Sequence, residues 1–248
     1  MEVTEIRLNK YLSEAGVCSR READRQIEEG HVLVNGKTAT KGQKVKKTDC
    51  VEYCGREVMG TPEAVLLLLN KPVGIVCTAE KREKHNVVDF MGYPVRLYPV
   101  GRLDKNSRGL LLMTNQGELV NQIMRSRYYH EKEYIVRVDR PIDAAFIKRM
   151  AAGVFLPELD VTTRPCKVEK ISKFTFRIIL TQGLNRQIRR MCEALGYKVD
   201  VLKRIRIMNV ELGDLKPGQV RELTEQELKE LYGTVKEREN AGISRTSE

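Results

Sequence analysis

The sequence has no long hydrophobic run. Hydrophobic residues make up 41% of its 248 residues. The longest apolar stretch, 64–69, is far shorter than the roughly 20 residues of a membrane-spanning helix. The first ten residues mix charges with single apolar residues, unlike a secretory signal. We therefore expect no membrane partner and a cytoplasmic protein.

Cysteine and histidine are too scattered to build a scaffold or a metal centre. The six cysteines stand at 18, 50, 54, 77, 166 and 192, and the three histidines share no ligand spacing. Cys50 and Cys54 are the one close pair, and neither a second pair nor a nearby histidine follows them, so reduced thiols are favoured over a zinc site. A nucleotide-binding fingerprint is also missing. We expect no metal and no cofactor.

Acidic residues are scarce in one segment of the chain. The net charge is +10, and 164–206 holds twelve Lys and Arg against three Asp and Glu, a surplus of nine. Concentrated positive charge is typical of a surface that binds phosphates. The sequence therefore predicts an anionic partner such as a nucleic acid.

The remaining pattern is one of short helices and strands. Within 6–30 we expect two helices, the second capped by Ser19 with Glu22, and Asn35-Gly36 predicts a hairpin. Glycine and proline near 56–63 predict a linker. Beyond it we expect strands at 64–69, 75–77, 132–138, 174–180 and 199–210, helices at 117–127, 141–153 and 224–232, and a disordered tail at 233–248.

A charged loop between two apolar runs is the most informative stretch. It reads Val-Gly-Arg-Leu-Asp-Lys-Asn-Ser-Arg-Gly-Leu-Leu-Leu over 100–112. Asp104 has Arg102, Lys105 and Arg108 as neighbours, and nearby positive charge favours an ionised carboxylate, as a nucleophile requires. On spacing alone, a charged loop with glycines is most often a solvated turn.

The order of residues in this loop resembles the catalytic motif of pseudouridine synthases of the RsuA/RluF type. Two further stretches resemble that family's motifs: Lys-Glu-Tyr at 132–134 and Thr-Gln-Gly-Leu-Asn-Arg-Gln-Ile-Arg-Arg-Met at 181–191. The stretches 130–134 and 206–210 have the character of the RluF branch, which acts on large-subunit (23S) ribosomal RNA. Gln116 departs from the commoner Asp of the family.

The first sixty residues resemble the S4 RNA-binding domain. The similarity lies in Arg-Leu-Asn-Lys-Tyr-Leu, Ser-Arg-Arg-Glu-Ala and Gly-His-Val-Leu-Val-Asn-Gly-Lys. The resemblance implies an α+β protein: an S4 domain (1–60) and a catalytic domain (61–232) with a mixed, mainly antiparallel sheet flanked by helices. It places the RNA contacts of this domain on Arg7, Lys10, Arg20, Arg21, Arg25 and Lys37. A solvated pair of amphipathic helices would show a similar charge pattern.

The resemblance also implies a reaction and a set of roles. A uridine in RNA would be isomerised after its base is flipped out. Asp104 would be the nucleophile and Arg189 its ion-pair partner. Tyr134 and Ile188 would hold the uracil, and Arg102 would fill the space that it leaves. Arg186 and Arg190 would contact RNA. A strand tyrosine is otherwise most often a core residue.

The sequence leaves several alternatives open. Asp104 could attack the uracil, attack C1′ or remove a sugar proton, and the target uridine is not specified. The chain could instead be an RNA-binding ribosome-assembly protein with an inactive synthase domain, although Asp104, Tyr134 and Arg189 are all present. A hydrolase of RNA phosphodiesters would usually carry metal carboxylates or paired histidines. We expect a monomer that binds ribosomal RNA, with other structured RNA as a second candidate partner.

Overall fold

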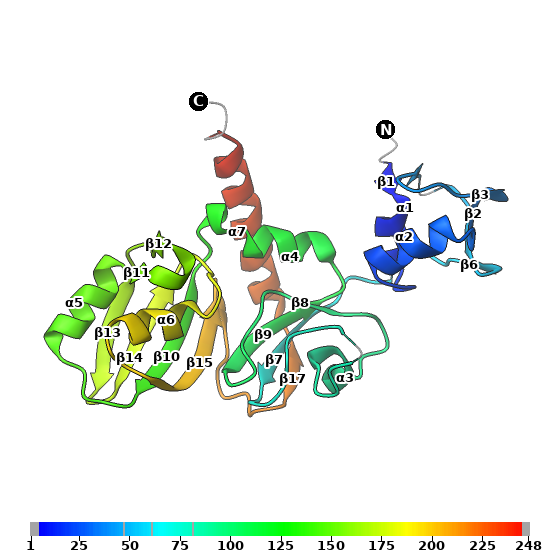
Figure 1. Cartoon of the computed structure of the whole chain (residues 1–248). Helices are drawn as coiled ribbons and strands as arrows, with labels where there is room; N and C mark the ends of the chain where they lie inside the picture. The colour runs from blue at the N-terminus through cyan, green and yellow to red at the C-terminus, as the bar shows by residue number, and fades with distance from the viewer. Residues whose placement is uncertain (1–4, 47, 61, 81, 245–248) are drawn as a thin grey trace. The chain divides into compact units, whose positions relative to one another are not determined.

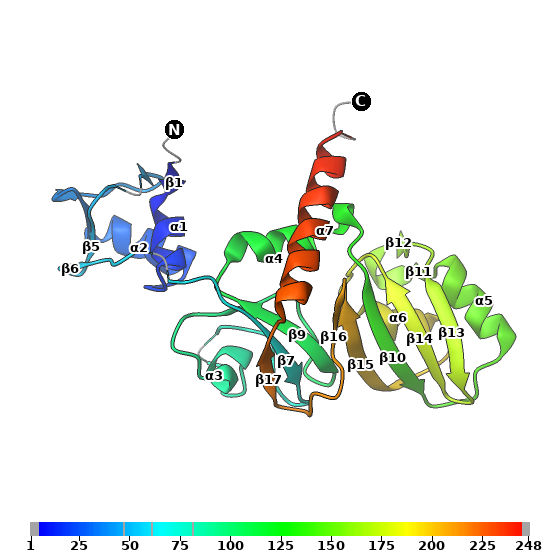
Figure 2. The same cartoon turned by 180° about the vertical axis from the view of Figure 1, so that it is seen from behind.

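The computed structural model describes residues 5–46, 48–60, 62–80 and 82–244. It divides into two compact units: 1–65 with 94–96 and 115–117, and the remainder of 66–248. Figures 1 and 2 show the chain from opposite sides. The predicted α+β class is confirmed.

The first unit packs two helices against short antiparallel strands. Its elements are β1 (Ile6–Arg7), α1 (Leu8–Glu14), α2 (Arg20–Glu28), β2 (Val32–Val34), β3 (Lys37–Thr38), β4 (Lys44–Val45), β5 (Val51–Tyr53) and β6 (Arg56–Glu57). Strands β3, β2, β5 and β6 form one sheet in that order, and β1 pairs with β4. Leu8, Leu12, Ala23, Ile27 and Val32 belong to its core.

Local signals in this unit are confirmed. The Ser19 hydroxyl accepts a hydrogen bond from the Glu22 N–H at the start of α2. Asn35 and Gly36 have φ values of 52° and 75° between β2 and β3, which is the left-handed pair of a type I′ hairpin. The first helix begins at Leu8 because Ile6 and Arg7 pair with β4 instead.

The second unit is built on a mixed sheet. Its strands are β7 (Leu66–Lys71), β8 (Tyr98–Pro99), β9 (Arg108–Thr114), β10 (Lys132–Val138), β13 (Lys167–Ser172), β14 (Thr175–Leu180), β15 (Val199–Ile207), β16 (Val210–Glu211) and β17 (Val220–Glu222), with a small β11 (Phe155–Leu156) and β12 (Val161–Thr162) pair beside them. The main order is β13-β14-β10-β15-β9-β7-β17. In the described residues only β15 and β9 run parallel, so the expected mainly antiparallel sheet is confirmed.

Helices cover the two ends of this sheet separately. They are α3 (Val87–Met91), α4 (Gly117–Met124), α5 (Ala144–Ala152), α6 (Gln187–Ala194) and α7 (Glu225–Ser244), with 3-10 turns at Ser126–Tyr128 and Pro157–Leu159. One core packs α5 and α6 on β10, β14 and β15, and another packs α4 and α7 on β7 and β9. Figures 1 and 2 show the same division.

Two predictions for this unit are wrong. Residues 233–244 were expected to be a disordered tail, but α7 continues to Ser244. It does so because Val235 is buried one turn beyond Leu231 and Arg238 donates to the Tyr128 carbonyl. The strand expected at 75–77 is only an isolated bridge from Val76 to Asn86. Residues 245–248 of the expected tail lie outside the described residues.

The short parallel contact between β15 and β9 depends on a glycine. Lys203 and Arg204 pair with Arg108 and Gly109. Gly109 has a φ of 107°, and a Cβ atom there would lie 2.2 Å from the Arg204 carbonyl oxygen and 2.8 Å from its nitrogen. Only glycine therefore allows the two backbones to approach this closely.

We expect Gly109→Ala to lower the free energy of unfolding by about 3 kcal/mol or more, because it adds both backbone strain and a backbone clash. Urea unfolding followed by circular dichroism measures this. Gly233→Ala is the control: Gly233 lies within α7 with no neighbour near its Cβ direction, and alanine there should add about 0.5–1 kcal/mol. Equal effects of the two changes would contradict the close approach at Gly109.

Candidate active site

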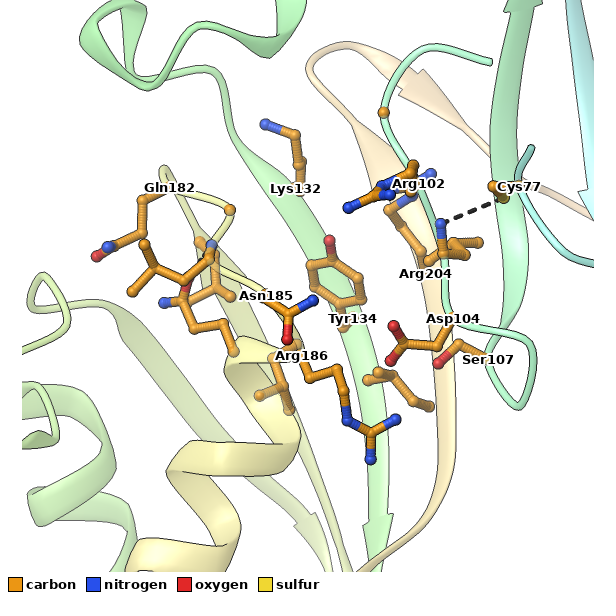
Figure 3. A pocket seen from close by; sticks show the side chains of 18 of the residues that line it. Cys77, Arg102, Asp104, Ser107, Lys132, Tyr134, Gln182, Asn185, Arg186 and Arg204 are labelled. Atoms are coloured by element: carbon orange, nitrogen blue, oxygen red, sulfur yellow. Dashed lines mark hydrogen bonds between the residues drawn. The ribbon is translucent and has the colours of Figure 1, made fainter. Parts of the chain in front are cut away.

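A cavity of about 430 Å³ lies in the second unit and collects the predicted site residues. Asp104, Tyr134 and Ile188 line it, together with Arg102 and Arg186. They come from the loop before β9, from β10, and from α6 and the residues preceding it. Figure 3 shows the Asp104 carboxylate and the Tyr134 ring on neighbouring sides of this space.

The loop that carries Asp104 is held in place by backbone contacts. The Leu103 N–H donates to the Cys77 sulfur at 3.4 Å (dashed in Figure 3), and the Gly74 N–H donates to the Lys105 carbonyl at 2.8 Å. Buried Lys71 donates to the Ser107 carbonyl at 2.8 Å. These contacts explain why 72–77 does not continue as a strand: it packs on the loop instead.

Arg189 joins α6 to this loop. Its Nε lies 3.5 Å from Asp104 Oδ2, a distance of ion pairing without a hydrogen bond. Its other nitrogens donate to the Asn106 carbonyl at 3.2 Å, to the Ser107 hydroxyl at 3.3 Å and to the Val199 carbonyl at 3.2 Å. The guanidinium is thus fixed by carbonyls and lies behind the carboxylate, outside the cavity lining.

Arg190, the next residue, points elsewhere. Its Nε donates to the Asn185 carbonyl at 3.0 Å, and its guanidinium pairs with Glu158. Adjacent positions on a helix lie about 100° apart, so the two arginines face different surroundings. Arg186 occupies the N-cap position of α6 with a left-handed φ of 49°, its side chain makes no capping hydrogen bond, and it is exposed at the cavity.

Ile188 and Tyr134 provide apolar surface in the cavity. Ile188 is 4% exposed and belongs to the core beneath α6. Tyr134 is half-buried and packs against the same core from β10. The Asp104 side chain is 30% exposed. A carboxylate that is held in position yet accessible, next to apolar surfaces, could react with a flat ligand.

Two cavity residues were missed by the sequence reasoning. Lys132 and Arg204 line the cavity, and both are buried. The sequence does contain a signal for them. By the alternation of a strand, Lys132 lies on the same face as Tyr134, and Arg204 lies on the same face as Leu202. Burial, with the nearby Arg204 charge as the next cause, lowers the pKa of Lys132 from 10.5 to about 8.

The candidate residues of the first unit are mostly at its surface. Arg7, Arg20, Arg21, Arg25 and Lys37 are exposed, and Lys10 is half-buried. Arg25 pairs with Glu22 at 2.5 Å, and Lys10 with Glu14 at 3.7 Å. Arg20 and Arg21 stand in the first turn of α2, where the helix dipole disfavours cations and favours an anionic ligand.

The described residues contain no cluster of three metal-ligating side chains, and Cys50 and Cys54 are both exposed free thiols. Within the same part of the chain, every helix is too short or too polar to cross a membrane.

Comparisons with known proteins agree on one family. The RNA pseudouridylate synthase model matches residues 65–194, and the S4 domain model matches 6–51. The dual-specificity RNA pseudouridine synthase RluF of Escherichia coli K12 is 55% identical over 92% of this chain and 78% of its own length. Ribosomal large subunit pseudouridine synthase B of Bacillus subtilis is 40% identical over 95% of this chain and 99% of its own. A crystal structure of a pseudouridylate synthase, 28% identical, superposes with a TM-score of 0.68 over 91% of this chain and 99% of that one.

The low pKa of Lys132 has a consequence for stability. Unfolded Lys132 loses its proton near pH 10.5 and folded Lys132 near pH 8. Charged Lys132 therefore destabilises the fold below pH 8, and this penalty fades as the pH rises to 10.5. We expect Lys132→Met to raise the free energy of unfolding at pH 7 by up to about 3 kcal/mol, with a gain that shrinks above pH 8.

Urea unfolding at several pH values measures this gain. Lys148→Met is the control, because Lys148 is exposed on α5, and the Lys132→Met gain is compared with its effect at each pH. A Lys132→Met gain that is the same at pH 7 and pH 10 would contradict the shift.

Proposed function

The chain belongs to the RNA pseudouridylate synthase family, and from this premise we propose that it isomerises a uridine of 23S ribosomal RNA with Asp104 as the nucleophile. As an RNA pseudouridine synthase it converts uridine in RNA to pseudouridine. The observation that carries the proposed role is the cavity in which Asp104, paired with Arg189, stands beside Tyr134 and Ile188.

The reaction exchanges one bond for another. The C1′–N1 bond breaks, the uracil turns, and a C1′–C5 bond forms. One proton leaves C5 and one is gained at N1, so no redox partner or group donor is consumed. A stacked base is out of reach, so the target must be flipped into the cavity, whose 430 Å³ falls within the range of small-ligand sites.

We assign a role to each side chain from its position at the cavity. Asp104 attacks the flipped nucleotide, and Arg189 holds the carboxylate in position, because its other donors are already fixed by backbone carbonyls. Tyr134 and Ile188 hold the uracil by contact with its faces. Arg102, which is exposed beside Asp104, fills the gap left in the RNA.

We assign RNA selection mainly to the S4 domain at 1–60 and the chemistry to 61–232. Arg7, Arg20, Arg21 and Lys37 are the contacts with the most accessible charge, whereas Lys10 and Arg25 share theirs with glutamates. Arg186 and Arg190 add phosphate contacts near the cavity, Arg190 more weakly because it pairs with Glu158. We propose a cytoplasmic monomer. Since one relative is described as dual-specificity, other structured RNA is a second candidate substrate.

We expect Asp104→Asn to lower the single-turnover rate by more than about a thousandfold, while the fold and RNA affinity persist. Tritium release from C5-labelled ribosomal RNA measures the rate. Asp200→Asn, a change at an exposed residue of β15, is the control and should react as wild type. Activity of Asp104→Asn within tenfold of wild type would remove Asp104 from the nucleophile role. A wild-type protein that binds RNA but forms no pseudouridine would instead indicate an assembly protein with an inactive synthase domain.

The S4 contacts are testable through salt dependence. Replacing Arg20 and Arg21 together by Gln should weaken RNA binding and reduce the slope of log affinity against log salt by about one for each lost phosphate contact. Filter binding between about 50 and 200 mM salt, an interval over which phosphate contacts change affinity by orders of magnitude, measures this. Lys148→Gln in the other unit is the control. An unchanged slope for the double variant would remove α2 from the RNA-binding surface.

A further inference from the structure

Two buried cations in the cavity have no carboxylate partner among the described residues. Arg204 is 1% exposed and Lys132 is 5% exposed. The Arg204 Nε donates to the Leu110 carbonyl at 2.7 Å, but its Nη2 is buried with no hydrogen-bond partner. The Lys132 ammonium makes a single long contact, 3.3 Å to the His130 carbonyl.

Both cations stand beside the Tyr134 ring. Arg204 on β15 is the direct cross-strand partner of Tyr134 on β10, and Lys132 lies two residues before Tyr134 on the same face of that strand. Figure 3 shows the Lys132 side chain beyond the hydroxyl end of the tyrosine ring, with its ammonium turned away from the ring, and all three residues line the cavity. Both cations therefore lie next to the part of the cavity where Tyr134 would contact a base.

A purely structural role accounts for only part of this arrangement. The Arg204 Nε braces β9 through Leu110, but that leaves the second nitrogen and the Lys132 ammonium unexplained. Burying a cation without a partner is costly, and two such cations repel each other. Costs of this kind are typical of groups that a ligand satisfies.

We propose that Arg204 and Lys132 bind a carbonyl oxygen of the flipped uracil and stabilise the negative charge that develops on it during isomerisation. The proposal rests on the function given above. When the C1′–N1 bond breaks, its electron pair leaves with the uracil and spreads over N1 and the carbonyl oxygens. The pair is then used in the new C1′–C5 bond, as C5 loses its proton and N1 gains one. Fixed donors aimed at such an oxygen lower the barrier without reorganisation.

Burial favours a base over a phosphate as the ligand. RNA phosphates stay at the rim when a base is flipped into a pocket, and the rim here already has exposed cations, Arg102, Lys105 and Arg186. Arg204 and Lys132 line the cavity yet expose almost no surface even to it, so only a group that enters the cavity and displaces their cover can contact them. Uracil brings two carbonyl oxygens into this space.

The test compares single-turnover rates on RNA that carries uridine, 4-thiouridine or 2-thiouridine at the target position, with product measured by chromatography of the digested RNA. We expect Arg204→Met and Lys132→Met each to lower the rate on uridine by about a hundredfold while RNA affinity changes less than threefold. Arg204→Lys should recover part of the loss. Arg137→Met, on the opposite, exposed face of β10, is the matched control and should react as wild type.

The sulfur substitutions identify the contact. Because sulfur is a weaker acceptor than oxygen, one of the two thio-RNAs should react more slowly with wild type, and this penalty should largely vanish in the Lys132 and Arg204 variants. If Arg204→Met does not fold, Lys132→Met decides alone, since we expect it to be more stable than wild type at pH 7.

Three outcomes would overturn the proposal. Variants within threefold of the wild-type rate would remove the two cations from the reaction. If the variants lose RNA affinity by the same factor as they lose rate, and the slower reaction of the thio-RNA is unchanged in them, the two cations contact a phosphate instead. A wild-type protein that forms no pseudouridine on any RNA would overturn the proposed function and this inference together, which separates that failure from the other two.

Discussion

The guanidinium of Arg189 is the contact on which the shape of the cavity depends. It belongs to α6, which packs on the β10–β14–β15 end of the sheet, yet it donates to Asn106 and Ser107 in the loop that precedes β9 at the other end. Lys71 supports the same loop from β7. The two ends of the sheet are thereby held at a fixed separation, and the proposed nucleophile stands where they meet.

The positive charges of this protein fall into two groups: those that are buried or paired within the fold, and those that are exposed. The basic surplus of 164–206 predicted a phosphate-binding surface, but several of its members are committed inside the fold. Arg206 binds Glu131 and Glu133, and Arg189 and Arg204 are buried. A count along the sequence cannot separate these from the exposed cations, because it contains no information on which face a strand buries.

Most of the fold that could be predicted from the sequence depends on local signals. The Ser19 cap and the Asn35-Gly36 turn are each decided by atoms within four residues of one another, and each is present. The extent of α7 depends instead on Val235 reaching a distant core, and the 72–77 loop on contacts with Lys105 and Leu103. The family resemblance of the motifs predicted that Asp104, Tyr134, Arg189 and Ile188 belong to one site. The position of Arg204 beside Tyr134 could not be predicted from alternation along one strand, because it also depends on the register between β10 and β15.

The parallel contact of β15 with β9 has a consequence for the order of assembly. Its partners, Arg204 and Gly109, are nearly a hundred residues apart in sequence, and β17 must still return to β7 across an even longer separation. Contacts between such distant residues form late because the closure of a long loop costs entropy first. A nascent chain in which β15 has not yet been synthesised lacks a strand that lines its cavity. Catalytic competence therefore requires the synthesis of both β15 and β17, and the first unit emerges before either strand.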